Sequence, residues 1–222
     1  MNPDDPGYRG QVDYTPQVLA IYDPWVLGFM ARVVWRSPTP PVVDRYRRHL
    51  GHRHLDVGPG TGYFLDKVEL LPERQVTLLD PNPNVLAHAS RRLAHMNPTN
   101  VEADVLKPLP VSGPFDSAAL SYVLHCLPGP QSDKAIAIKN VAAVLAPDGV
   151  LFGGTVLGSS ERHTRLGRAV LWVFNRRGAF DNLSDTQEGL REILEESFRT
   201  VEIEVIGSVA HFTATGVKRA PS

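Results

Sequence analysis

The chain has 222 residues, 42% of them hydrophobic, which is enough for the core of one full-sized α/β domain. Its 23 Lys and Arg nearly balance 24 Asp and Glu, so the charge excludes the positive field on which non-specific nucleic-acid binding depends. A single cysteine, Cys126, and the lack of any apolar run of about 18 residues predict a soluble, cytoplasmic protein with no nucleic-acid partner and no stable membrane association.

The N-terminal part of the chain predicts helices that precede a sheet. Residues 1–13 are polar and rich in Pro, Asp and Gly, so we expect a loose arm there. From 15 to 35 the apolar residues recur at helical spacings, and Pro24 suits the start of a second helix. The Pro-rich run at 37–41 ends this pair, and a short helix is expected over 43–50.

The middle of the chain alternates between strand and helix patterns. We expect strands over 54–57, 75–80, 100–103, 115–122 and 149–157, and helices over 63–71, 84–96 and 132–145. Such alternation is typical of a mainly parallel sheet with helices on both faces. Ligands of such folds bind beyond the carboxyl ends of the strands, so the site should lie there.

The last part of the chain departs from this alternation. After a polar loop we expect helices over 164–177 and 184–198, followed by strands over 201–206 and 209–217. Only Gly207 and Ser208 separate the two strands, which is too short for a crossover. The closing pair should therefore be antiparallel.

A glycine-rich turn directly follows the first predicted strand. The stretch HLDVGPGTG places Gly58, Gly60 and Gly62 at alternate positions, where missing side chains let the backbone approach a ligand. It differs from the dinucleotide motif G-x-G-x-x-G because Tyr63 stands at the third glycine position. Asp56, just before the turn, would repel phosphates and favours a ligand with a cationic or amine-bearing end.

Two further carboxylates follow the next strands. Asp80 ends the apolar strand 75–80, where a carboxylate can accept two hydrogen bonds from a ribose diol. Asp104 follows the strand after that and can accept a hydrogen bond from an adenine amine, with Val105 beside the base. Glycines after strands often serve packing alone, and an Asp at a strand end often caps a helix. The order and spacing of the set favour a nucleoside site.

Together these residues resemble the class I S-adenosylmethionine-dependent methyltransferases of the small-molecule type, over residues 14–217. The turn at 145–149 resembles the one before the fifth strand of these enzymes, and the closing hairpin resembles their strands six and seven. The resemblance implies that the glycine turn lies against the methionine portion of the cofactor. The cofactor-binding residues that we expect are Tyr14, Tyr22, Asp56, Gly58, Pro59, Gly60, Gly62, Asp80, Asp104, Val105 and Ser121.

The resemblance implies a Rossmann-like, doubly wound α/β fold with a mainly parallel seven-stranded sheet, an antiparallel last strand and helices on both faces. We expect one domain over 1–222. Its parts are an N-terminal helical lid (1–50), a cofactor-binding core (51–157), a substrate-lid insert (158–198) and a C-terminal strand hairpin (199–218).

Methyl transfer from a sulfonium needs alignment and exclusion of water, and a base only where the acceptor must lose a proton. His125 follows the fourth strand of the sheet, where acceptor and sulfonium would meet, and is the first candidate base; His163 is the second. Packing of His125 against the next helix, and a solvated loop position for His163, are the alternatives. The oxygen ligands of the metal-dependent catechol methyltransferases are missing from matching positions, so we expect no metal.

The apolar residues of the N-terminal segment and of the insert favour a flat hydrophobic acceptor, aromatic or polyketide-like, from secondary metabolism. The same residues could instead pack as core or form a homodimer interface. Transfer to oxygen is the first hypothesis, and transfer to nitrogen or carbon of a small metabolite is the second. A catalytically inactive, cofactor-binding regulatory subunit stays open, whereas Tyr63 disfavours an NAD-dependent oxidoreductase.

Overall fold

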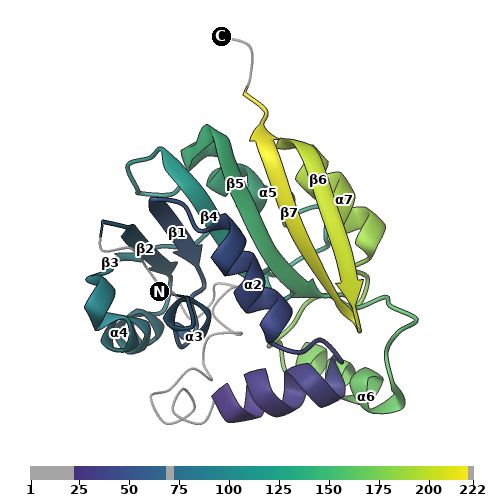
Figure 1. The fold of residues 1–222 in the computed structure, drawn as a ribbon. Helices are drawn as coiled ribbons and strands as arrows, with labels where there is room; N and C mark the ends of the chain where they lie inside the picture. The colour runs from purple at the N-terminus through teal and green to yellow at the C-terminus, as the bar shows by residue number, and fades with distance from the viewer. Residues whose placement is uncertain (1–22, 69–72, 220–222) are drawn as a thin grey trace.

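The computed structural model describes residues 23–68 and 73–219 and contains a seven-stranded sheet with helices on both faces (Figure 1). The strands are β1 (Arg53–Val57), β2 (Gln75–Asp80), β3 (Thr99–Glu102), β4 (Phe115–Ser121), β5 (Leu145–Val156), β6 (Phe198–Ile206) and β7 (Val209–Val217). Their order is β3-β2-β1-β4-β5-β7-β6, with β7 antiparallel to both of its neighbours and β1 to β5 parallel. The predicted Rossmann-like fold with an antiparallel last strand is confirmed.

The helices divide between the two faces of the sheet and the carboxyl ends of its strands. They are η2 (Asp23–Val34), α2 (Pro40–His49), α3 (Tyr63–Asp66), α4 (Pro83–Arg92), η3 (Ala94–Met96), η4 (Leu124–Cys126), α5 (Ala135–Val144), α6 (Arg165–Arg176) and α7 (Gln187–Glu195). One apolar core lies under α2, α3 and α4, and the other under α5 and α7. No helix in the described ranges is long and apolar enough to cross a membrane.

Several helix ends differ from the sequence prediction for local reasons. The Pro-rich run also begins a helix, since Pro40 and Pro41 occupy the first positions of α2. A missing N–H costs nothing there, because the first N–H groups of a helix have no partner within it. Helix α7 begins at Gln187, later than predicted, because Thr186 caps it by accepting a hydrogen bond from the Gly189 N–H at 2.9 Å. The predicted N-terminal arm (1–13) and Tyr14 lie outside the described residues.

The N-terminal helix η2 is tied to the opposite end of the chain. With α6 it forms a third apolar cluster at the carboxyl end of β5. The carbonyl of Trp35 accepts a hydrogen bond from the Ser208 N–H at 2.9 Å. Gly207, at φ +59, lies so close that a Cβ there would be 2.1 Å from the Trp35 oxygen. Only glycine fits this contact, so the turn between β6 and β7 holds the end of η2 in place.

The outer strand β6 is protected against further pairing. Arg162 donates a hydrogen bond to the Val205 carbonyl at 2.6 Å, and Arg191 donates one to the Val201 carbonyl at 3.0 Å. Guanidinium groups therefore occupy carbonyls that an additional strand would need, which is a common way of blocking an open sheet edge.

A buried ion pair connects the start of α5 with the segment before α7. The Lys134 ammonium is fully buried, 2.7 Å from Asp185 Oδ2, and donates a hydrogen bond to the Asp181 carbonyl at 2.6 Å. Removing a charge of this kind from water is costly unless it is paired. The pair therefore holds the segment 181–185 firmly against the sheet.

Lys134→Met should lower the free energy of unfolding by about 3–5 kcal/mol, because it leaves the Asp185 carboxylate buried without its partner. Urea denaturation measures this change. Lys139→Met, on the exposed side of the same helix, is the matched control and should change stability by less than about 0.5 kcal/mol. Equal midpoints for the two variants would contradict this role of the ion pair.

Candidate functional site

The polar residues singled out in the sequence meet where β1, β2 and β4 end. β1 pairs in parallel with β2 on one side and with β4 on the other, so the chain reverses its winding direction at β1 (Figure 1). The chain continues from β1 and from β4 to helices on opposite faces, α3 and α5, and the crevice beyond the strand ends at such a point is the usual ligand site.

The three glycines of the turn after β1 have different surroundings. All have positive φ, at +65 for Gly58, +56 for Gly60 and +75 for Gly62. A Cβ on Gly58 would lie 2.5 Å from the Val123 side chain, and one on Gly62 would lie 3.1 Å from Leu93. A Cβ on Gly60 would have no atom within 4 Å. Gly58 and Gly62 therefore serve close packing, whereas Gly60 faces open space that a ligand can enter.

Asp56 is buried behind this turn and faces α2. Its two oxygens accept hydrogen bonds from the Tyr46 hydroxyl, at 3.3 and 3.1 Å. Burial raises the pKa of the Asp56 carboxyl to about 7, and the Tyr46 hydrogen bond offsets only part of that rise. His54 Nε2 lies 4.0 Å from Asp56 Oδ2. The carboxylate is thus held from behind, and its predicted role toward a cationic ligand stays a prediction.

Asp80 ends β2 beside the glycine turn. Its Oδ1 accepts a hydrogen bond from the Asn82 N–H at 2.8 Å. Burial raises the pKa of the Asp80 carboxyl to about 7, and the Asn82 hydrogen bond lowers it only in part. A poorly hydrated carboxylate gains more than an exposed one from new hydrogen-bond donors. Asp80 is therefore well placed to accept them from a ligand.

Asp104 and Val105 lie just after β3. Asp104 Oδ1 accepts a hydrogen bond from the Leu106 N–H at 2.9 Å, which fixes the turn. Val105 is buried, and its carbonyl accepts a hydrogen bond from the Asn140 side chain at 2.9 Å. Both residues are therefore rigidly placed at the same sheet edge as Asp80.

The end of β4 carries a strained backbone. Tyr122 has φ +63, which is rare for a bulky residue, and its N–H donates a hydrogen bond to the Gly154 carbonyl at 2.7 Å. Strain of this kind collects at ligand sites. The buried Ser121 hydroxyl lies near the Tyr46 phenol without forming a hydrogen bond of regular geometry. Its predicted contact with the cofactor stays a prediction.

His125 is 3% exposed and sits in the short helix η4 that follows β4. Its Nδ1 accepts a hydrogen bond from the Val156 N–H at 3.3 Å and lies 3.2 Å from Thr155 Oγ1. The ring contacts Phe180 edge to face, with 4.3 Å between centroids. Burial, together with the nearby Lys134 charge, lowers the pKa of His125 to about 3, so the ring is neutral at physiological pH.

The alternative to a catalytic role for His163 was a solvated loop position, and the structure does not show one. It is 5% exposed, and its Nε2 lies 2.6 Å from the Leu157 carbonyl, to which it donates. Its Nδ1 is buried without a hydrogen-bond partner. The predicted catalytic roles of His125 and His163 both stay predictions.

Three important residues were missed in the sequence. Tyr46 was not singled out, although its spacing from Val42 and Leu50 marks the buried side of a helix. Tyr122 and Phe180 carry no local signal, because a backbone outlier and a contact over 55 residues depend on tertiary structure. Tyr14 and Tyr22 lie outside the described residues, and their predicted contacts with the cofactor stay predictions.

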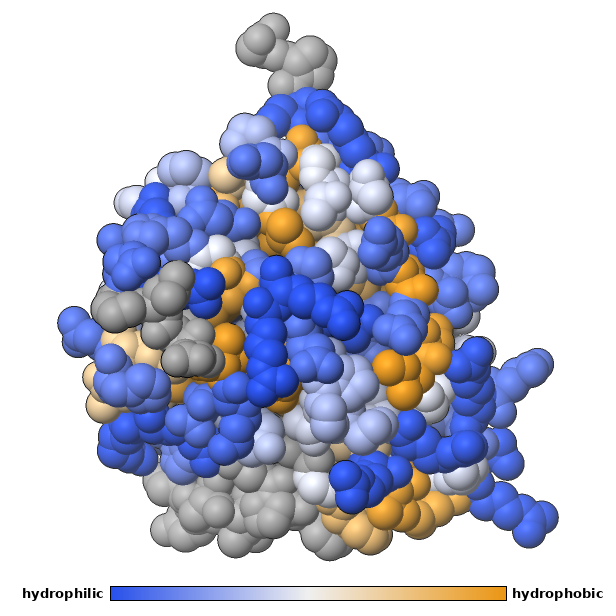
Figure 2. Space-filling model, in the orientation of Figure 1, coloured by the Kyte–Doolittle hydropathy of each residue, from blue (hydrophilic) through white to orange (hydrophobic). Residues whose placement is uncertain are grey.

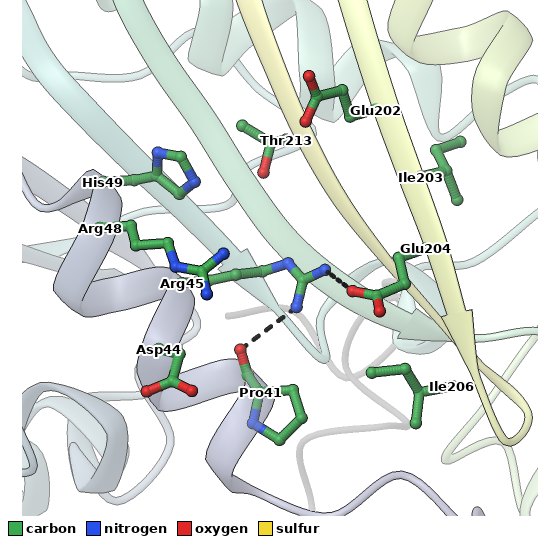
Figure 3. A pocket seen from close by; sticks show the side chains of 10 residues that line it. All are labelled: Pro41, Asp44, Arg45, Arg48, His49, Glu202, Ile203, Glu204, Ile206 and Thr213. Atoms are coloured by element: carbon green, nitrogen blue, oxygen red, sulfur yellow. Dashed lines mark hydrogen bonds and ion pairs between the residues drawn. The ribbon is translucent and has the colours of Figure 1, made fainter.

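A second hollow lies on the face of the sheet between α2 and the strands β6 and β7 (Figure 3). This cleft, of about 540 Å³, shares no lining residue with the site described above. Arg45 crosses it and forms a 2.7 Å ion pair with Glu204. Figure 2 shows that the surface around it is mostly hydrophilic. Cationic and anionic side chains face each other across the cleft, which gives it no single charge preference.

The comparisons with known proteins agree with this geometry. A family profile described as "Methyltransferase domain" matches residues 55–151. The chain is 40% identical to demethylluteothin O-methyltransferase of Streptomyces thioluteus, over 92% of this chain and 90% of that protein. It is 38% identical to the physcion biosynthesis cluster O-methyltransferase of Aspergillus chevalieri, over 94% and 96%. The chain belongs to the S-adenosylmethionine-dependent methyltransferases.

The comparison with solved structures shows the same fold. The N-methyltransferase NodS of Bradyrhizobium japonicum, solved in complex with S-adenosyl-L-homocysteine, matches with a TM-score of 0.64 at 18% identity, over 96% of this chain and 99% of that one. The cofactor of this methyltransferase is S-adenosylmethionine. Within the described ranges, no group of three or more His, Cys, Asp or Glu could hold a metal ion. The expectation of a metal-free reaction stays a prediction.

The raised pKa of Asp80 predicts a pH-dependent stability difference. Since burial raises this pKa from 3.8 to about 7, the folded protein keeps a proton in this range that the unfolded chain has released. The free energy of unfolding of the wild-type protein therefore falls as the pH rises through this window, because ionisation of Asp80 is favoured in the unfolded chain. The asparagine of Asp80→Asn does not titrate there. Urea denaturation should show the free energy of unfolding of Asp80→Asn rising relative to wild type from about pH 4 to about pH 7. A difference that is flat with pH would contradict the burial of this charge, and Asp148→Asn is the exposed control.

Proposed function

We propose that this methyltransferase transfers the methyl group to an oxygen atom of a flat, hydrophobic small molecule, aromatic or polyketide-like, in secondary metabolism. The observation that carries this proposal is the row of aromatic side chains beside the glycine turn. The names of the two relatives, both O-methyltransferases, support the same atom and the same class of acceptor.

The carboxyl ends of β1, β2 and β3 offer the parts that the cofactor needs. The open space at Gly60 accepts the methionine portion against the backbone. The desolvated Asp80 carboxylate accepts hydrogen bonds from the ribose hydroxyls, and the fixed pair Asp104 and Val105 receives the adenine. Asp56, behind the turn, supplies negative charge toward the ammonium and sulfonium groups.

The acceptor end is formed by aromatic side chains from separate elements. Phe64 stacks on Tyr122 with 6.2 Å between the ring centroids, and Tyr122 contacts His125 edge to face with 6.1 Å between centroids. Phe180 continues the row, 4.3 Å from His125 and 6.0 Å from Trp35. Such a row provides flat apolar surfaces on which an aromatic ring can stack.

The chemistry places few demands on the protein. The acceptor oxygen displaces a neutral thioether from the methyl carbon, and positive charge disperses as the bond forms. The residues contribute by aligning the two reactants and by excluding water, for which buried, rigidly packed side chains are suited. When bound, S-adenosylmethionine supplies the methyl group.

The direct test of this function has two parts. Calorimetric titration should show binding of S-adenosylmethionine and S-adenosylhomocysteine, and Asp80→Asn should weaken both about tenfold or more, because it removes a charged acceptor. Turnover with a methyl-labelled donor should then give labelled ethers from aromatic hydroxyl compounds. Binding of the cofactor without any labelled product from hydroxyl, amine or carbon acceptors would favour a regulatory subunit. If only amines or carbon atoms were labelled, the methyl group would be transferred to nitrogen or carbon and not to oxygen.

Two glycine variants separate ligand contact from packing. Alanine at Gly60 or at Gly62 carries the same left-handed strain, about 1–2 kcal/mol. Only the Gly60→Ala methyl group enters the open space, so this variant should bind S-adenosylmethionine about tenfold more weakly or worse, whereas Gly62→Ala should lose stability and keep its affinity. Calorimetry and thermal unfolding measure the two effects. Equal affinities would show that the turn does not contact the cofactor.

The cytoplasm is the proposed location of the reaction, since the single thiol, Cys126, forms no disulfide. The expectation of a homodimer stays a prediction. Apolar side chains reach the surface on η2 and α6, along the lower edge of the view in Figure 2. Phe29 and Val33 are 44% exposed and Leu166 is 49% exposed. Light scattering in solution would decide whether a second copy covers them.

A further inference from the structure

The two ring nitrogens of His125 have different surroundings, which fixes where its proton sits. A backbone N–H can only donate a hydrogen bond, so the Val156 N–H, 3.3 Å away, requires an unprotonated Nδ1 in the ring. The Thr155 hydroxyl, 3.2 Å from the same nitrogen, can donate to it as well. The proton of the neutral imidazole is therefore on Nε2. In this tautomer Nε2 donates hydrogen bonds and cannot accept a proton.

The sheet makes this arrangement rigid. The last residue of β4, Ser121, pairs with Gly154 of β5, so β5 runs past the end of β4 by two residues. The Val156 N–H is thereby left without a strand partner on that side, and His125 occupies the position. On the other side Val156 pairs with Val209 of β7. The donor cannot turn away from His125 without breaking the sheet.

We propose that His125 is not a general base but a fixed hydrogen-bond donor, whose Nε2–H binds the acceptor oxygen after that oxygen has lost its proton. The acceptor class that follows is an acidic hydroxyl, an enol or electron-poor phenol that ionises in water near neutral pH. This inference rests on the proposed transfer to oxygen.

The bond changes balance without a base in the protein. The hydroxyl releases its proton to water before the methyl transfer. The oxyanion then forms a bond to the methyl carbon, and the carbon–sulfur bond breaks with its electron pair remaining on sulfur. The sulfonium and the oxyanion become a neutral thioether and a neutral ether, so no proton moves in this step.

The groups packed around His125 favour the neutral ring. The charged or titratable groups that face it or its segment are Tyr122, Cys126, Lys134, Asp181 and Asp185. Burial raises the pKa of the Cys126 thiol to about 12, so it stays neutral. Burial and the Lys134 charge oppose protonation of His125, and burial lowers its pKa to about 3. Such a ring is a weak proton acceptor even in the other tautomer.

The second candidate, His163, cannot replace it as a base. Its Nε2 donates to the Leu157 carbonyl at 2.6 Å, which leaves Nδ1 as the only basic atom. Nδ1 is enclosed by protein. An acceptor hydroxyl therefore cannot approach the lone pair.

A matched pair of variants tests the proposal. In His125→Gln the side chain keeps an oxygen for the Val156 N–H and an amide N–H for the acceptor, but it cannot take a proton. In His125→Leu both hydrogen-bonding groups are lost. We expect kcat of His125→Gln within about fivefold of wild type and kcat of His125→Leu lower by about 10²-fold, the usual effect of removing one donor to a reacting oxygen. Equally large losses in both variants would identify a base and overturn the proposal.

A second measurement uses the wild-type protein and does not depend on folding of the variants. The pH profile of kcat/KM is recorded for nitro- and halogen-substituted phenols and naphthols of graded acidity, with labelled methyl donor. The midpoint should follow the pKa of each acceptor hydroxyl. One constant midpoint for every acceptor would assign the proton to a protein group and overturn the inference while the proposed function stands. Absence of labelled ether from every hydroxyl compound would overturn both. The affinity for S-adenosylhomocysteine should be unchanged in both variants.

Discussion

The site depends on the close approach of the turn after β1 to the loop after β4. A Cβ on Gly58 would lie 2.5 Å from the Val123 side chain, so the two loops touch with no room for a larger residue. Val123 stands between the strained Tyr122 and the helix that carries His125. This contact therefore fixes how the two loops are aligned at the edge of the sheet where the site is predicted. Alignment is thus a property of backbone packing.

The second constraint is the exclusion of water from the polar groups of the site. Burial raises the pKa of Asp56 and Asp80 to about 7 and lowers the pKa of His54 and His125 to about 3. All four shifts have the same cause, since each favours the neutral form of a side chain removed from water. Two opposite charges attract each other more strongly in such surroundings than in water. A cationic cofactor can therefore restore the charge that burial suppresses in the two carboxyl groups.

Much of the fold could be predicted because its signals are local. The apolar run of β2 lies between turn residues, and its predicted bounds, 75–80, agree with the structure. The glycine turn and Asp80 were found in the same way, from the residues next to a strand. Features set by distant contacts left no such signal. The tautomer of His125 depends on a backbone N–H of β5, and the placement of Phe180 depends on a segment held by the Lys134–Asp185 pair. Local patterns can identify a catalytic candidate, but its protonation depends on the assembled sheet.

The place of β7 in the sheet has a consequence for synthesis on the ribosome. This strand is the last strand of the sheet to be made, and yet it pairs with both β5 and β6. Until it emerges, β6 has no partner strand in the sheet, and the Trp35 carbonyl lacks the turn that holds it. The nascent chain can build the parallel half first, but helix η2 reaches its final position only after the turn before β7 has been made. A chain truncated before β7 would thus leave the ribosome with β6 unpaired and with the end of η2 not held.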